Sequence, residues 1–142
     1  GMGNAAMLGL GLALAQPDRP VLVITGDGEM LMGLGALATI AVQAPANLSI
    51  VVIDNELYGE TGRQPTHTGQ GVNLADMARA AGFEDAETIT DSAGVGALKA
   101  RLEEPGPRFA CIKVGPENGP MVLPERDGIA IKTRFRQALL SG

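Results

Sequence analysis

The residues "VLVITGDGEMLMGLGALATIAVQAPANLSIVVIDNELYG", at positions 21–59, decide the fold. Two apolar runs lie in this stretch, at 21–26 and at 48–55. Continuous apolar runs of this length are typical of parallel strands that are buried on both faces. The first run is followed by Asp27 and the second closes with Asn55. The sequence therefore predicts two strands that each end in a small side chain bearing oxygen.

The rest of the chain alternates helical and strand patterns. Such alternation predicts a three-layer α/β/α domain with a mostly parallel central sheet, and 142 residues suffice for one such domain, spanning 1–142. The predicted helices cover 3–16, 29–43, 73–82 (with Asn73 as N-cap and Gly82 at its end), 91–104 and 128–140, and further strands cover 86–90 and 108–115. Residues 55–72 are predicted to form a long loop and 116–126 a Pro-rich crossing.

Composition excludes several classes of partner. The net charge of −5 argues against nucleic acid and anionic membranes. No apolar run reaches membrane-spanning length. The one cysteine, Cys111, excludes an internal disulfide and indicates a reducing cytoplasm. Gly1 before Met2 resembles the residue that a cleaved purification tag leaves, in which case the reading frame opens at Met2.

Asp27 and Asn55 together point to metal chemistry. In an open parallel sheet, ligands bind at the carboxyl ends of the strands, and both residues are predicted to lie there. With a backbone carbonyl near Leu57 they offer three protein oxygens. Mg²⁺ takes six oxygens and rarely draws all of them from protein, so phosphate oxygens and water would complete its shell. The pattern thus predicts a clamp for a metal-diphosphate, although each fragment alone is more typical of an ordinary turn.

At this point the sequence resembles a known family. Gly26-Asp27-Gly28, followed by Asn55 at the close of an apolar strand, is similar to the signature of thiamine-diphosphate (ThDP) enzymes. The similarity continues through Tyr58-Gly59 and includes "GMGNAAMLGLGLALA" at 1–15. The loop "LYGETGRQPTHT" is most similar to the sulfopyruvate and phosphonopyruvate decarboxylase branch.

The resemblance implies a role for individual residues. Asp27, the Asn55 side chain and the Leu57 carbonyl would bind Mg²⁺. The amides of Gly28 and Glu29 would reach the diphosphate. The cofactor-binding set that it implies is Met2, Gly26, Asp27, Gly28, Glu29, Asn55, Leu57, Tyr58 and Gly59, in which Met2 would hold the cofactor in its bent form.

Departures from the family pattern are informative. Many relatives carry Ser where this chain has Glu29, and because a carboxylate would repel the diphosphate, the Glu29 side chain is expected to turn away. Asp54 stands where relatives usually have Asn. The glutamate that activates the cofactor lies, in this family, on a separate pyrimidine-binding domain, and nothing in 1–142 corresponds to that domain.

The loop and the second helix carry weaker candidates. His67, the only histidine, could act as an acid or base, and a solvated loop residue is the competing interpretation. Arg63 and Gln64 could recognise an acidic substrate tail, with an exposed loop as the alternative. Gly33 and Gly35 lie inside the helix predicted at 29–43, where close packing, with a second subunit as a natural candidate, would explain them.

Two functions fit these observations. In the first, the chain is the Mg-ThDP-binding half of a decarboxylase for a small 2-oxoacid, a homo-oligomer that needs an alpha-type partner subunit with the pyrimidine-binding domain. In the second, it is a truncated, self-associating domain that at most binds Mg-diphosphate. A nicotinamide-binding Rossmann domain is a weak third possibility, because no strand precedes Gly1-Met2-Gly3.

Overall fold

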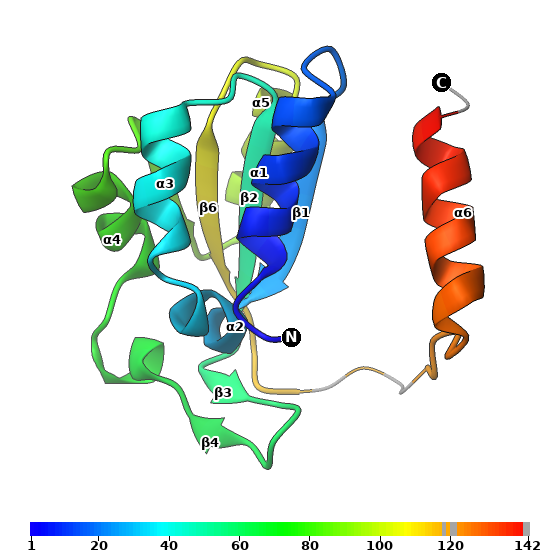
Figure 1. Ribbon diagram of the computed structural model, residues 1–142. Coiled ribbons are helices and arrows are strands. Elements are labelled where there is room, and N and C mark those ends of the chain that lie inside the picture. Colours follow the sequence, from blue (N-terminus) through cyan, green and yellow to red (C-terminus); the bar gives the residue numbers. More distant parts are fainter. Residues whose placement is uncertain (118, 120–121, 141–142) are drawn as a thin grey trace.

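A four-stranded parallel sheet forms the centre of the molecule (Figure 1). The structure, a computed structural model, describes residues 1–117, 119 and 122–140. The strands occur in the order β1-β2-β6-β5. Their bounds are β1 Val21–Gly26, β2 Leu48–Asp54, β6 Arg108–Lys113 and β5 Asp85–Ile89. The predicted neighbours β1 and β2 pair in parallel, with Gly26 opposite Ile53.

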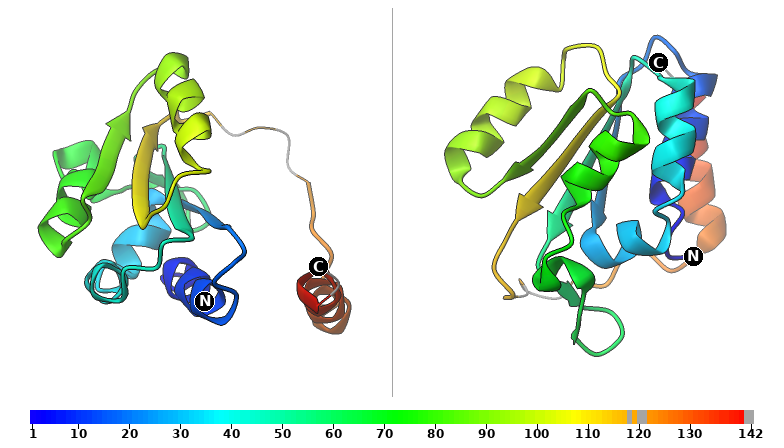
Figure 2. Two further views of the ribbon diagram at one scale, coloured as in Figure 1. Left: turned by 90° about the horizontal axis from the view of Figure 1, so that it is seen from above. Right: turned by 90° about the vertical axis from the view of Figure 1, so that its left-hand side faces the viewer.

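Helices cover both faces of this sheet. Helices α1 (Ala5–Ala15), α3 (Ala36–Gln43) and α4 (Leu74–Ala81) lie on one face, and α5 (Ser92–Arg101) lies on the other (Figure 2). The larger core lies between the sheet and the three helices, and the smaller one beneath α5, where Val51, Ile89, Leu98 and Ala110 meet. The predicted three-layer α/β/α architecture is confirmed.

Local signals set the predicted helix boundaries in the second half of the chain. The Asn73 side chain accepts hydrogen bonds from the amides of Ala75 and Asp76, at 2.9 and 3.1 Å. Gly82 ends α4 in the left-handed conformation, with φ of 113°. Asp91 caps α5 by accepting from the amide of Gly94 at 2.7 Å. These caps satisfy amide groups that a helix leaves unpaired at its start.

The helix predicted over 29–43 is wrong as a single element. The chain forms a short α2 (Asp27–Met32) and then α3, with a break around Gly33. A Cβ on Gly33 would lie 2.2 Å from the carbonyl oxygen of Gly3, whereas one on Gly35 would meet nothing within 4 Å. The backbone that packs closely against Gly33 is therefore the N-terminal turn of the same chain, at Gly3.

Gly33→Ala is expected to destabilise the fold by about 2 kcal/mol, because the added methyl collides with backbone that has to move. Gly35→Ala is the matched control. Gly35 lies at the N-cap position of α3, with φ of −60° and ψ of −20°, angles that alanine adopts without strain, so alanine there should change the stability by less than about 1 kcal/mol. Thermal unfolding of both variants measures the difference, and equal melting temperatures would contradict this account of Gly33.

The segment predicted as a loop over 55–72 contains local structure. Strands β3 (Leu57–Tyr58) and β4 (Gln64–Pro65) form a small antiparallel hairpin, and a 3-10 helix, η1, covers His67–Gln70. The hairpin turns through Gly62 and Arg63, with φ of 125° and 61°. A positive φ is uncommon in a residue other than glycine, and no sequence pattern indicates that Arg63 adopts one. The hairpin is therefore not predictable from the sequence.

Strand β1 is the edge strand of the sheet in the described part of the chain. Its predicted burial on both faces is wrong, because the side chains on one of its faces are exposed. Leu22 and Ile24 are 47% and 65% exposed.

Helix α6 (Gly128–Leu140) stands apart from the sheet (Figure 1). It contacts the rest of the chain where Arg19 Nη1 donates to the Ala138 carbonyl at 3.1 Å. Residues 118, 120 and 121 of the predicted crossing lie outside the described residues. None of the described helices is long and apolar enough to cross a membrane.

Candidate metal and cofactor site

A pocket of about 630 Å³ opens at the carboxyl ends of β1 and β2. Its walls come from the N-terminal turn, the start of α2, the β3 hairpin and the segment after β6. Every residue that the sequence assigned to the cofactor lines it: Met2, Gly26, Asp27, Gly28, Glu29, Asn55, Leu57, Tyr58 and Gly59. The fold therefore gathers these residues around one cavity.

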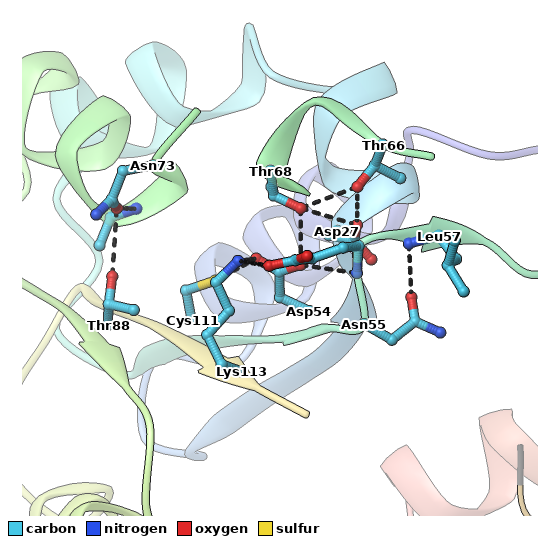
Figure 3. Close-up of polar contacts among 12 residues, drawn as sticks. Asp27, Asp54, Asn55, Leu57, Thr66, Thr68, Asn73, Thr88, Cys111 and Lys113 are labelled. Atoms are coloured by element: carbon cyan, nitrogen blue, oxygen red, sulfur yellow. Dashed lines mark hydrogen bonds and ion pairs between the residues drawn. The ribbon is translucent and has the colours of Figure 1, made fainter. Parts of the chain in front are cut away.

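Asp27 lies at the base of the pocket and is 1% exposed. Its Oδ2 accepts a hydrogen bond from the Thr66 hydroxyl at 2.5 Å, and the Thr68 hydroxyl lies 3.3 Å from the same oxygen (Figure 3). Both hydroxyls lie against Oδ2, so the second oxygen, Oδ1, is the one left to a ligand.

Asn55 and Leu57 supply two further oxygens beside Asp27. The Asn55 Oδ1 accepts from the amide of Leu57 at 3.1 Å, and the Leu57 carbonyl accepts from the amide of Gly59 at 3.1 Å. Each oxygen retains a second lone pair. Since Gly26 and Ile53 are opposite each other in the sheet, the residues that follow them lie together at the carboxyl ends of β1 and β2.

This donor set fits Mg²⁺. One carboxylate, one amide oxygen and one carbonyl are hard oxygen ligands, and they leave coordination positions for phosphate and water. Nowhere among the described residues do three His, Cys, Asp or Glu side chains gather to hold a metal. A cation in this pocket would therefore be held by the carboxylate of Asp27, the amide oxygen of Asn55 and the carbonyl of Leu57, together with the bound diphosphate.

The described walls of the pocket are acidic. Its described walls contain Asp27, Glu29, Glu60 and Glu117, and no Lys or Arg. A bare diphosphate would be repelled by these carboxylates. The amides at the start of α2 offer donors that the helix leaves unpaired, which suits a diphosphate only if its charge is offset.

Glu29 turns its carboxylate toward the start of α1, as electrostatic repulsion predicts. Its Oε1 accepts from the amides of Gly3 and Ala5, both at 2.9 Å, and its Oε2 accepts from the Thr25 hydroxyl at 2.7 Å. Asn4, at the N-cap position of α1, makes no side-chain capping bond. Glu29 thus caps α1 from outside and fixes the turn that places Met2 in the pocket.

Tyr58 lies against Gly28. A Cβ on Gly28 would lie 2.5 Å from the ring carbon Cδ1 of Tyr58, so only glycine permits this packing. The ring therefore closes one side of the pocket beside the start of α2.

A buried polar network that the sequence did not predict lies behind Asp27. Asp54, 1% exposed, accepts from Thr68 Oγ1 at 2.8 Å and from the Glu56 amide at 3.1 Å, and pairs with Lys113 Nζ at 2.9 Å. Burial works against the charge of Lys113, but hydrogen bonds to Glu56 and Asp54 raise its pKa. The network joins the end of β2 to the loop that carries both threonines.

Cys111 contacts the same network through Asp54, with Sγ 3.5 Å from Oδ2. Burial, and then the charge of Asp54, raise the pKa of its thiol to about 12. The thiol is therefore protonated at neutral pH and is a structural, unreactive group.

The remaining loop candidates lie outside the pocket walls. His67 is exposed and is not among the lining residues. Arg63 donates through Nη2 to the Pro116 carbonyl at 2.8 Å, and Gln64 bonds to Thr61. The structure thus brings the predicted metal ligands to one pocket. It leaves Arg63 and Gln64 at the surface of the hairpin, and His67 at the surface of η1.

Comparison with known proteins agrees with this geometry. The chain is 39% identical over 138 residues to the sulfopyruvate decarboxylase subunit beta of Methanocaldococcus jannaschii, covering 97% of this chain and 73% of that protein. It is 40% identical over 116 residues to the phosphonopyruvate decarboxylase of Streptomyces viridochromogenes, covering 81% of this chain and 29% of that protein.

A solved structure agrees in fold. It is the thiamine diphosphate-dependent 4-hydroxybenzoylformate decarboxylase of Rhodococcus jostii RHA1, with a TM-score of 0.67 at 20% identity over 83% of this chain and 24% of that one. Residues 1–114 match the family model described as "Thiamine pyrophosphate enzyme, C-terminal TPP binding domain", where thiamine pyrophosphate (TPP) is another name for ThDP. The chain therefore belongs to the thiamine pyrophosphate enzyme family, as a C-terminal TPP-binding domain.

Proposed function

We propose that this chain is the Mg-ThDP-binding half of a 2-oxoacid decarboxylase, with sulfopyruvate or phosphonopyruvate as the substrate type. The observation that carries the proposal is the convergence of Asp27, Asn55 and Leu57 on a pocket whose described walls lack Lys and Arg. The beta-subunit relatives support the choice of substrate. The other part of the active site, the pyrimidine-binding domain, would come from an alpha-type partner subunit.

The residues of this chain would divide the work as follows. Asp27 Oδ1, Asn55 Oδ1 and the Leu57 carbonyl would hold Mg²⁺, and the amides of Gly28 and Glu29 would orient the diphosphate. Met2 and Tyr58 would enclose the rest of the cofactor. When bound, ThDP supplies the electron sink for the carbanion left by CO₂ loss. The proposal assigns no step to His67, which is exposed outside the pocket.

The assembly is also part of the proposal. Apolar side chains are exposed on neighbouring elements, including Leu8 at 72%, Leu22 at 47% and Ile24 at 65%, which supports a homo-oligomer or a larger complex. The single reduced cysteine supports a cytoplasmic location. The same exposed surface favours the second candidate, a non-catalytic, self-associating domain.

Decarboxylation assays separate these two candidates. We expect the chain alone, with Mg²⁺ and ThDP, to release no CO₂ from sulfopyruvate or phosphonopyruvate, because the activating glutamate would lie on the partner. Mixing it with an alpha-type subunit that carries the pyrimidine-binding domain should restore turnover. CO₂ release by the chain alone would contradict the need for a partner. An inactive mixture, formed with a chain that binds Mg-ThDP, would favour the non-catalytic candidate.

A further inference from the structure

Thr66 is fully buried and makes two different connections at the metal site. Its hydroxyl lies 2.5 Å from Asp27 Oδ2, and its backbone amide donates to the Glu56 carbonyl at 2.9 Å. Glu56 stands between Asn55 and Leu57. One residue therefore joins Asp27, at the end of β1, to the segment that supplies the other two candidate ligands.

The protons available to the two threonines settle which hydroxyl holds Asp27. Each hydroxyl has one proton to donate. Four oxygen contacts share those two protons: Thr66 to Asp27 at 2.5 Å, Thr68 to Asp54 at 2.8 Å, Thr66 to Thr68 at 2.9 Å and Thr68 to Asp27 at 3.3 Å. The shortest contact takes the Thr66 proton. The Thr68 hydroxyl lies closer to Asp54 and to Thr66 than to Asp27 (Figure 3). Thr68 therefore contacts Thr66 and Asp54 and does not itself hold the Asp27 carboxylate.

We propose that Thr66 is a positioning residue of the metal site: it holds Asp27 Oδ2 with its hydroxyl and the segment 55–57 with its backbone, and so presents a single oxygen of Asp27 to the cation. This inference rests on the proposed function. A carboxylate held through one oxygen binds a cation in monodentate fashion. Mg²⁺ demands a compact octahedron, whereas Ca²⁺ accepts more ligands and bidentate carboxylates. Thr66 therefore favours Mg²⁺ over Ca²⁺.

The test compares two affinities of the full chain. ThDP is titrated calorimetrically in excess Mg²⁺ and, separately, in excess Ca²⁺. We expect Thr66→Val to raise the affinity with Ca²⁺ relative to that with Mg²⁺ by about tenfold, because the released Asp27 carboxylate can turn both oxygens to the larger ion. Thr66→Ser keeps the hydroxyl and should keep the wild-type ratio. Thr88→Val is the matched control, since within the described part of the chain the Thr88 hydroxyl bonds to Asn73 alone, at 3.2 Å.

A second measurement needs no cofactor. The hairpin exposes Arg63, and trypsin cleavage after Arg63 in the metal-free chain should be faster in Thr66→Val than in Thr66→Ser. If Thr66→Val does not fold, Thr68→Val removes the hydroxyl that contacts Thr66 and should shift the ratio in the same direction by less. Equal losses of affinity with both cations would reduce Thr66 to a structural role and overturn the inference alone. Absence of binding to wild type with either cation, when the alpha-type partner subunit is also present, would overturn the proposed function, and the inference with it.

Discussion

Replacing Asp27 with asparagine is expected to weaken Mg-dependent ThDP binding by about 100-fold or more, since loss of a supporting contact alone typically costs 10- to 100-fold and this change removes a ligand. The charge is lost while the shape remains. Asparagine can still accept from the Thr66 hydroxyl, so the buried base of the pocket keeps its contacts. What disappears is the one carboxylate ligand in the set of three oxygens. With no Lys or Arg in the described pocket walls, nothing else there offsets the diphosphate charge.

Asp76→Asn is the matched control for this change. Asp76 lies on α4, is 65% exposed at its side chain and pairs with Arg79, so its replacement should leave cofactor affinity unchanged. Calorimetric titration of ThDP in Mg²⁺ and in EDTA measures the metal-dependent part of the affinity for each protein. Undiminished Mg-dependent binding by a folded Asp27→Asn variant would remove Asp27 from the metal site.

Asp85→Asn is expected to lower the free energy of unfolding by about 3 kcal/mol, and the melting temperature by about 10 °C. Asp85 Oδ2 accepts from Arg108 Nε at 2.5 Å, and the Arg108 side chain is 2% exposed. Asp85 also pairs with Arg101. Removing the Asp85 carboxylate leaves the buried guanidinium with only the exposed and more distant Glu104, 3.5 Å from Nη2, as a counter-charge, which is a costly change.

Glu87→Gln is the control for Asp85→Asn. Glu87 lies on the same strand and pairs with Arg101 at 2.7 Å, with both side chains 32% exposed. Because it does not reach Arg108, its replacement should cost less than about 1 kcal/mol. Denaturant unfolding of the two variants at pH 7 gives the comparison, and similar losses would contradict the role of Arg108.

The same contact predicts a pH dependence. Burial opposes ionisation of Asp85, but hydrogen bonds and charge from Arg101 and Arg108 lower its pKa below the ordinary 3.8. A depressed pKa in the folded state means that the stabilisation is present above the unfolded value and is lost as pH falls through the folded one. The difference in stability between wild type and Asp85→Asn should therefore shrink below about pH 4. A difference that stays constant down to pH 2 would contradict this assignment.

Sequence patterns predicted the elements that depend on local chemistry. The two apolar strands, the Asn73 cap, the start of a helix at 91 and the alternation of strands with helices were all evident, because hydrophobic period and capping residues act over a few positions. The same patterns predicted that Asp27 and Asn55 lie together at the carboxyl ends of two strands. The break at Gly33 was not predictable, since its cause is the approach of Gly3, thirty residues earlier.

The buried network was missed for a related reason. Thr66 and Thr68 lie in a stretch without periodicity, and their partners Asp27 and Asp54 are distant in sequence. The two threonines on either side of His67 are the signal that the sequence offers for this network. Strand β1 differs from its prediction for another reason: its apolar sequence is suited to burial on both faces, but the described chain covers only one of them.

The most direct test of the account is a crystal structure of this chain grown with ThDP and Mn²⁺, which replaces Mg²⁺ and scatters X-rays anomalously. We expect one anomalous peak within coordination distance, about 2.2 Å, of Asp27 Oδ1, Asn55 Oδ1 and the Leu57 carbonyl oxygen, with diphosphate density beside it. Ordered ThDP with the peak elsewhere, or with no peak at these three oxygens, would contradict the metal-diphosphate site proposed for the end of β1 and β2.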